Sequence, residues 1–114
     1  MNTVEYLKRI RSKINTPDLW TKGKYADHRN DVTCYCLLGA LYSIVFNELP
    51  DENERKFRTL IGNVIKVAYP DRRRYKDIMT DEIIVNFNDH PDTTHDDVMR
   101  VLDIAIERAE HGPL

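Results

Sequence analysis

The sequence predicts an all-α fold, organised as one compact domain of about four main helices with short additional turns. Two observations support this prediction. Apolar residues recur every three to four positions over several separate segments, which is the period of an amphipathic helix. Helix-capping residues, prolines and glycines bound these segments, as expected at helix ends. A length of 114 residues fits a single domain, residues 1–114, with one core.

Charge and hydropathy exclude several classes of protein. The formal net charge of −2 gives no overall attraction to duplex nucleic acid or to an anionic membrane. No apolar run approaches the roughly 20 residues that a membrane span needs, and the N-terminus lacks the pattern of a signal peptide. We therefore expect a cytoplasmic protein, with neither membrane nor duplex nucleic acid as partner. Cys34 and Cys36 are then expected to be free thiols.

The first third of the chain predicts one helix, one short turn and one loop. Residues 3–14 carry an apolar stripe after Asn2, a good N-cap residue. Pro17 suits the first position of a short helical turn that ends at Trp20. Residues 21–32 are polar and predict a long loop, and long ordered loops are often functional.

The stretch of residues 31–46 contains the longest apolar run and predicts a central helix around which the other segments pack. Either Asp31 or Thr33 can cap it. Gly39 and Ala40 lie within this helix. Because Gly costs roughly 1 kcal/mol against Ala inside a helix, we expect a close contact there, either with another segment of the chain or with a second copy in a homo-oligomer.

Another long helix is predicted over residues 51–68, antiparallel to the central one and stopped by Pro70. The basic cluster of residues 72–76 follows it. This cluster predicts either a solvated connector or a rim that binds anions, since Arg matches phosphate geometry well.

The last third of the chain predicts one ambiguous segment and one clear helix. Residues 83–87 alternate in polarity but have no evident partner strand, so we favour a short helix or an extended packed segment. Thr94 and Asp97 form a capping box in sequence, and residues 94–109 then carry a helical stripe that ends before Gly112.

Four short motifs stand in a defined order along the chain. They are Trp20-Thr21-Lys22-Gly23, Cys34-Tyr35-Cys36-Leu37-Leu38-Gly39-Ala40-Leu41, Phe87-Asn88-Asp89 and Thr94-His95-Asp96-Asp97-Val98. Together they resemble a family of small bacterial and bacteriophage proteins classed as a domain of unknown function. Phe87 stands where that family often has Trp, and Asp97 where it often has Glu. The resemblance implies an all-α single domain, and it implies no activity. It points to five residues: Trp20, Cys36, Asn88, Asp89 and His95.

One candidate site is a reactive thiol. In the first turn of the predicted central helix, Cys36 would be favoured as a thiolate by the helix dipole. With His95 as its base and Asn88 or Asp89 nearby, Cys36 would complete the set of groups used by a thiol hydrolase or transferase. The alternative is that Cys34, which lies on the apolar stripe, only fills the core and that His95 is only a residue of a helix start. Cys36 lies just off that stripe.

A metal site receives less support from the sequence. Cys34, Cys36, His90 and His95 are all potential ligands, but their spacing is not one of the usual zinc patterns. We expect neither a metal ion nor a cofactor.

The leading hypothesis is a non-enzymatic binding protein that takes a small polar or nucleotide-like ligand, or a protein partner. Aromatic, amide and charged groups suit a base, a ribose or a phosphate. The alternative is that Asn88 and Asp89 are turn residues that bond their own backbone. Because the resembling family includes phage members, inhibition of host defence signalling is one version, by analogy alone. The candidate ligand-binding residues are Trp20, Tyr25, Arg29, Asn88, Asp89 and His95.

Overall fold

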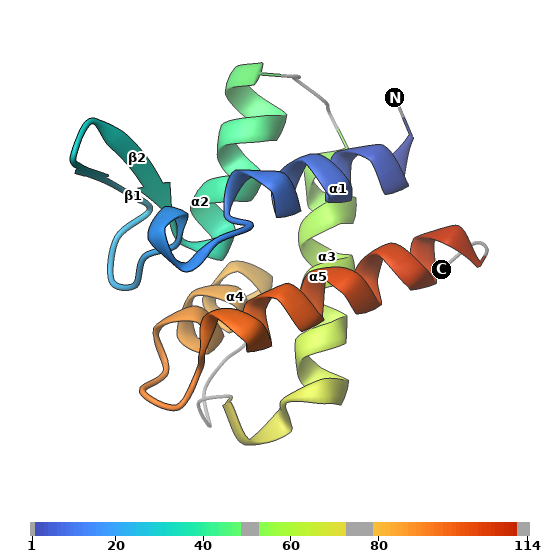
Figure 1. The fold of residues 1–114 in the computed structure, drawn as a ribbon. Helices are drawn as coiled ribbons and strands as arrows, with labels where there is room; N and C mark the ends of the chain where they lie inside the picture. The colour runs from blue at the N-terminus through green and yellow to red at the C-terminus, as the bar shows by residue number, and fades with distance from the viewer. Residues whose placement is uncertain (1, 49–52, 73–78, 112–114) are drawn as a thin grey trace.

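The computed structural model describes residues 2–48, 53–72 and 79–111, which form a predominantly helical fold with one small hairpin (Figure 1). The helices are α1 Thr3–Lys13, α2 Leu37–Tyr42, α3 Glu54–Ala68, α4 Thr80–Asp89 and α5 His95–Glu110. The strands are β1 Ala26–Arg29 and β2 Val32–Tyr35. Shorter pieces are the 3₁₀ turns Pro17–Leu19 and Pro70–Arg72 and the π-helical segment Ser43–Glu48, which continues α2.

The predictions for the first and last helices are confirmed. The Asn2 side chain accepts a hydrogen bond from the Glu5 N–H at 2.9 Å and caps α1. At the start of α5, the Thr94 side chain accepts from the Asp97 N–H, and the Asp97 carboxylate accepts from the Thr94 N–H. Each cap supplies a partner for helix-end N–H groups that have none within the helix.

Helix α3 ends before Pro70, as predicted, and it packs against α2, α4 and α5. In Figure 1 it runs back antiparallel to α2. The predicted start of this helix at residue 51, most of the basic cluster and the predicted stop at Gly112 lie outside the described residues. From the cluster, Arg72 is described, and it pairs with Asp97 at 3.0 Å.

The prediction of an all-α fold is wrong in one place. Part of the polar stretch at residues 21–32 forms an antiparallel hairpin, which pairs Ala26 with Tyr35 and Arg29 with Val32. The two turn residues, Asn30 and Asp31, have φ angles of 50° and 65°. Two consecutive positive φ angles are typical of the two-residue turns that match the twist of a hairpin. The hairpin projects at one end of the helical body (Figure 1).

The central helix starts later than predicted. Strand β2 takes up residues 32–35, so neither Asp31 nor Thr33 caps the helix. Cys36 is the N-cap, and its sulfur accepts a hydrogen bond from the Gly39 N–H at 3.2 Å. Cys34 belongs to the strand, where it is fully buried.

The close contact expected at Gly39 is present, and it lies within the chain. A Cβ atom at this position would collide with the backbone carbonyl oxygen of Tyr25. Both Gly39 and Ala40 are buried. Because both residues are buried within the single chain, they present no exposed surface to a second copy.

Residues 83–87 are helical and form the middle of α4, with Ile83, Ile84 and Phe87 buried. Their apolar side chains join those of α1, α2, α3 and α5 in one hydrophobic cluster. Helices α1 and α5 lie side by side across this cluster (Figure 1). Among the helices of the described residues, none is long and apolar enough to cross a membrane.

We expect Gly39→Ala to lower the free energy of unfolding by about 1–3 kcal/mol, the usual cost of overpacking a core. The contact is with backbone, which yields less readily than a side chain. Urea denaturation measures the change. Gly62→Ala is the matched control. Its methyl group meets the Cγ2 atom of Thr80 at 2.8 Å, a side-chain atom that must shift, and the substitution gains helix propensity. Equal stability of Gly39→Ala and the wild type would contradict this packing.

Candidate functional site

The side chain of Asn88 joins three segments of the chain. Asn88 is completely buried at the end of α4. Its Oδ1 accepts hydrogen bonds from the Trp20 Nε1–H at 2.6 Å and from the Leu37 N–H at 3.0 Å. Its Nδ2 donates to the Thr21 carbonyl oxygen and to Asp89 Oδ1, both at 3.0 Å. An amide side chain has two acceptor and two donor positions, and Asn88 uses all four.

Each of these bonds provides for a group that burial would otherwise leave unpaired. Leu37 is the first residue of α2, so its N–H has no acceptor within the helix. The indole of Trp20 packs beside the imidazole of His95, with ring centroids 6.0 Å apart. Trp20 thus connects the hairpin region to α4.

The side chain of Asp89, the next residue, is directed to the loop that contains Gly23. Its Oδ1 accepts from the Gly23 N–H at 2.9 Å and from Asn88 Nδ2 at 3.0 Å. Gly23 has a φ of 80°, a conformation that favours glycine. Asp89 is also the last residue of α4, where the helix dipole disfavours a negative charge. The two donated hydrogen bonds offset that cost and fix the position of the carboxylate.

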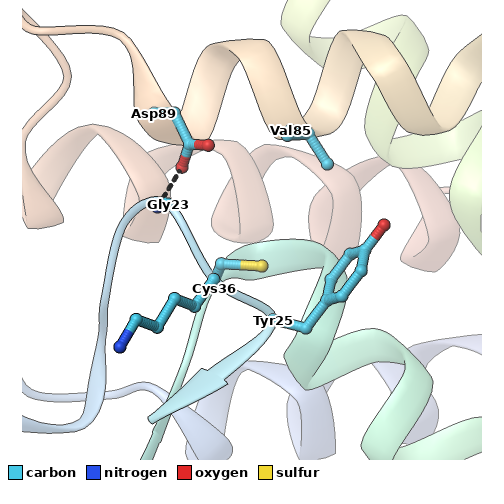
Figure 2. Close-up of a pocket in the computed structure, with 6 residues that line it drawn as sticks. Gly23, Tyr25, Cys36, Val85 and Asp89 are labelled. Carbon is cyan, nitrogen blue, oxygen red and sulfur yellow. Dashed lines mark hydrogen bonds between the residues drawn. The ribbon is translucent and has the colours of Figure 1, made fainter.

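A pocket of about 260 Å³ opens beside this carboxylate. It is lined by Gly23, Lys24, Tyr25, Cys36, Val85 and Asp89. Figure 2 shows how three segments contribute: α4 supplies Val85 and Asp89, the segment before β1 supplies Gly23 and Tyr25, and the start of α2 supplies Cys36. The hydrogen bonds of Asn88 hold these three segments together, so the pocket exists where that network places it.

The lining combines apolar surface with one fixed anion. The Tyr25 ring, the Val85 side chain and the Cys36 sulfur are weakly polar, and the Asp89 carboxylate is the acidic group. Lys24 also lines the pocket, but its ammonium lies 3.7 Å from Asp27 Oδ1 and its side chain is largely exposed. The arrangement can hold a small molecule by one hydrogen-bonding end and an apolar or flat body.

The thiol of Cys36 is not activated, which corrects the expectation of a thiolate. Burial raises the pKa of Cys36, and the nearby charge of Asp89 raises it further, while the hydrogen bond from Gly39 only partly opposes these effects. The expectation took the helix dipole into account but not the desolvation of the thiol. From the sequence, Cys36 is expected inside the helix, whereas in the structure it lies beneath the hairpin segment. Cys36 is therefore a neutral thiol at pH 7.

The predicted partner of that thiol is held elsewhere. His95 Nε2 lies 2.7 Å from the carbonyl oxygen of Ile14, and within the described residues no hydrogen bond joins His95 to Cys36. In the same part of the chain, no three His, Cys, Asp or Glu side chains gather as a metal site would require. Arg29 donates hydrogen bonds to Asp27 and to Thr21 Oγ1, and so connects β1 to the segment that precedes the hairpin.

The predicted site residues thus fall into two groups. Trp20, Arg29, Asn88 and His95 do not line the pocket; they form contacts around it. The pocket itself is lined by Tyr25, Cys36 and Asp89, together with three residues that the sequence analysis did not single out: Gly23, Lys24 and Val85. A helical reading of residues 83–87 would have placed Val85 one turn before Asp89 on the same face.

Comparison with known proteins identifies a family and no function. Residues 1–108 match the family of unknown function DUF6197, so the chain belongs to that family. This agrees with the resemblance to a domain of unknown function noted from the sequence motifs. Neither a curated protein nor a solved structure is significantly similar to the chain.

We expect Asn88→Ala to destabilise the protein by about 3 kcal/mol or more, because each buried group left unsatisfied costs about 1–3 kcal/mol. The Leu37 N–H, the Trp20 indole and the Thr21 carbonyl would all lose their partner. Urea denaturation followed by tryptophan fluorescence measures the loss. Asn63→Ala, on the exposed face of α3, is the control and should be neutral or slightly stabilising. Similar stability of both variants would contradict the role assigned to Asn88.

We expect iodoacetamide to alkylate Cys36 more slowly at pH 7 than it alkylates the unfolded chain, with a rate that rises with pH. The thiolate is the reactive form, and a raised pKa lowers its fraction at neutral pH. The same shift means that any stability gained from the neutral thiol is lost as the pH rises through the folded-state pKa. A Cys34→Ser background isolates the signal. Rapid alkylation that His95→Ala slows would instead support the thiol enzyme.

Proposed function

We propose that this member of DUF6197 is a small binding protein that holds a small polar ligand in the pocket beside Asp89, without chemistry on that ligand. The single observation that carries the proposal is the carboxylate itself. It lies in a pocket of about 260 Å³, it is fixed by two donated hydrogen bonds, and it occupies a helix end that disfavours it. A carboxylate held in a fixed position in a pocket with an apolar lining is the kind of polar group that orients a bound ligand.

The pocket suits a ligand that donates a hydrogen bond to Asp89 and lays an apolar or flat part against Tyr25 and Val85. A nucleotide-like ligand fits this description if the amino group of its base reaches the carboxylate and its phosphate stays outside the pocket. Sequestration of a host signalling molecule would be one use of such a site. That version rests on the phage proteins in the resembling family and on analogy alone.

The geometry favours binding over thiol catalysis. A nucleophilic cysteine needs a lowered pKa or an adjacent base, whereas burial raises the pKa of Cys36 and His95 is bonded to Ile14. A neutral thiol in the lining supplies soft, weakly polar surface to a ligand.

A protein partner is the second candidate, and a separate observation supports it. Tyr25, Tyr42 and Phe46 form a continuous row of rings, with centroids 6.2 Å and 5.3 Å apart. Tyr25 and Phe46 are 58% and 54% exposed. Exposed aromatic residues are common in protein interfaces.

A melting-temperature screen tests the proposal for a small ligand. Nucleosides, nucleotides, amino acids and amines are added one at a time to the wild type and to Asp89→Asn. A ligand at 100 times its Kd stabilises the folded state by about 2.7 kcal/mol, so a true ligand raises the wild-type melting temperature. We expect Asp89→Asn to fold, because the amide oxygen can still accept from Gly23 and Asn88, but to lose that shift.

Asp92→Asn is the matched control, since Asp92 is exposed in the turn after α4 and does not line the pocket. It should keep the wild-type response to the ligand. The proposal fails if no small molecule stabilises the wild type, or if every stabilising compound acts equally on Asp89→Asn.

A further inference from the structure

We propose that the ligand of this pocket carries a primary ammonium group, bound by Asp89, and an aromatic or apolar tail that lies along the row of Tyr25, Tyr42 and Phe46. This inference rests on the proposed binding function and names the class of ligand. It follows from which oxygen of Asp89 is available, from the charges around that oxygen and from the surface that continues outward from the pocket.

The hydrogen bonds that Asp89 already accepts favour a ligand group that donates to one carboxylate oxygen only. Oδ1 already accepts two hydrogen bonds, from Gly23 and from Asn88, which matches the two lone-pair positions of one carboxylate oxygen. Oδ2 takes part in neither of these two bonds, so it is the oxygen left for a ligand. A guanidinium group binds carboxylates through two parallel hydrogen bonds, one to each oxygen. With Oδ1 occupied, that fork cannot form, and a guanine edge meets the same obstacle. An ammonium is a compact point charge that needs only one oxygen.

The charges around Oδ2 favour a cation. The carboxylate lies at the C-terminal end of α4, where the backbone carbonyls contribute a partial negative charge. Cys36 is a neutral thiol at pH 7, so it adds no charge to the pocket.

The two nearest lysines are directed to other acceptors. Lys24 lies 3.7 Å from Asp27 Oδ1, and Lys22 donates to the carbonyl oxygen of His90 at 2.7 Å. An anionic head group would meet the Asp89 carboxylate without a dedicated cation to offset the repulsion.

The aromatic row supplies the second half of the site. The ring of Tyr25 lines the pocket and lies across Cys36 from Asp89 in Figure 2. An ammonium between the two would gain the carboxylate and the negative face of the ring. The ring of Tyr42 lies beside that of Tyr25, and the ring of Phe46 lies beside that of Tyr42. A pocket of about 260 Å³ lies just below the usual range for ligand sites, so it suits the head of such a molecule while the tail rests on the row.

Compounds that share one tail and differ in the head group test this inference. Phenethylamine, phenethylguanidine, N-acetylphenethylamine and phenylpropionate are titrated calorimetrically into the wild type, Asp89→Asn and Asp92→Asn. We expect phenethylamine to bind the wild type and Asp92→Asn. It should bind Asp89→Asn at least about tenfold more weakly, the usual order of effect for a hydrogen bond to a charged group. The guanidine should bind more weakly than the amine, and the neutral and anionic compounds weakest.

Two variants of Tyr25 test the tail without disturbing the fold, because this side chain is mostly exposed. Tyr25→Ala should weaken phenethylamine several-fold, while Tyr25→Phe keeps the ring and should bind like the wild type. Nα-acetyl-lysine amide distinguishes a free amine from a lysine side chain of a partner. Binding of that compound as tightly as phenethylamine would assign the site to a peptide lysine.

The inference is overturned if phenethylguanidine or guanosine binds through Asp89 as tightly as phenethylamine does. In that case the binding function stands and only the ligand class is wrong. If neither these compounds nor any member of the broader melting-temperature panel binds the wild type, the proposed function falls as well.

Discussion

The structure depends on one buried amide. Asn88 has no exposed surface, and an unpaired buried polar group costs more than a hydrogen bond normally contributes. Its side chain therefore belongs in the core only because four groups satisfy it: the Trp20 indole, the Leu37 N–H, the Thr21 carbonyl and Asp89. These groups come from the start of the hairpin region, the start of α2 and the end of α4. One residue thereby fixes three parts of the chain that are distant in sequence.

The candidate site follows from that constraint. Asn88 and Asp89 are neighbours at the end of α4, and they divide the work: the amide turns inward and holds the segments together, while the carboxylate lines the pocket. The loop that carries Gly23 is held at both places, because its Thr21 carbonyl accepts from Asn88 and its Gly23 N–H donates to Asp89. The position of the carboxylate is thus set by the same network that stabilises the fold.

Much of the helical framework could be predicted from periodicity and caps. Helices α1, α3 and α5 have wide apolar stripes, and the caps at Asn2 and Thr94 formed as their side chains suggest. The hairpin could not be predicted in the same way, because each strand has only four residues and β1 is mostly exposed, so it lacks an alternating apolar pattern. Its best signal was the pair Asn30-Asp31, two residues that tolerate positive φ. Because the hairpin was not predicted, the predicted start of the central helix was also misplaced.

The same omission explains what was missed at the site. Trp20, Cys36, Asn88 and Asp89 could be named as candidates from the sequence, but their roles depend on burial and on hydrogen-bond direction, which spacing alone does not give. Cys36 was expected to be activated by a helix dipole, yet its desolvation beside the Tyr25 segment raises the pKa of the thiol. The sequence suggests that Asn88 is either a turn residue or a ligand contact. Its full set of hydrogen bonds within the chain fits neither role.

Hydrogen exchange measured by NMR tests the role of Asn88 most directly. The Trp20 indole N–H and the Leu37 backbone N–H both donate to one buried oxygen. If that oxygen anchors the fold, both protons exchange as slowly as the amides in the middle of α5, because they are released only by opening of the core. If either proton exchanges freely while the α5 amides stay protected, the buried amide is not the element on which the site and the fold depend.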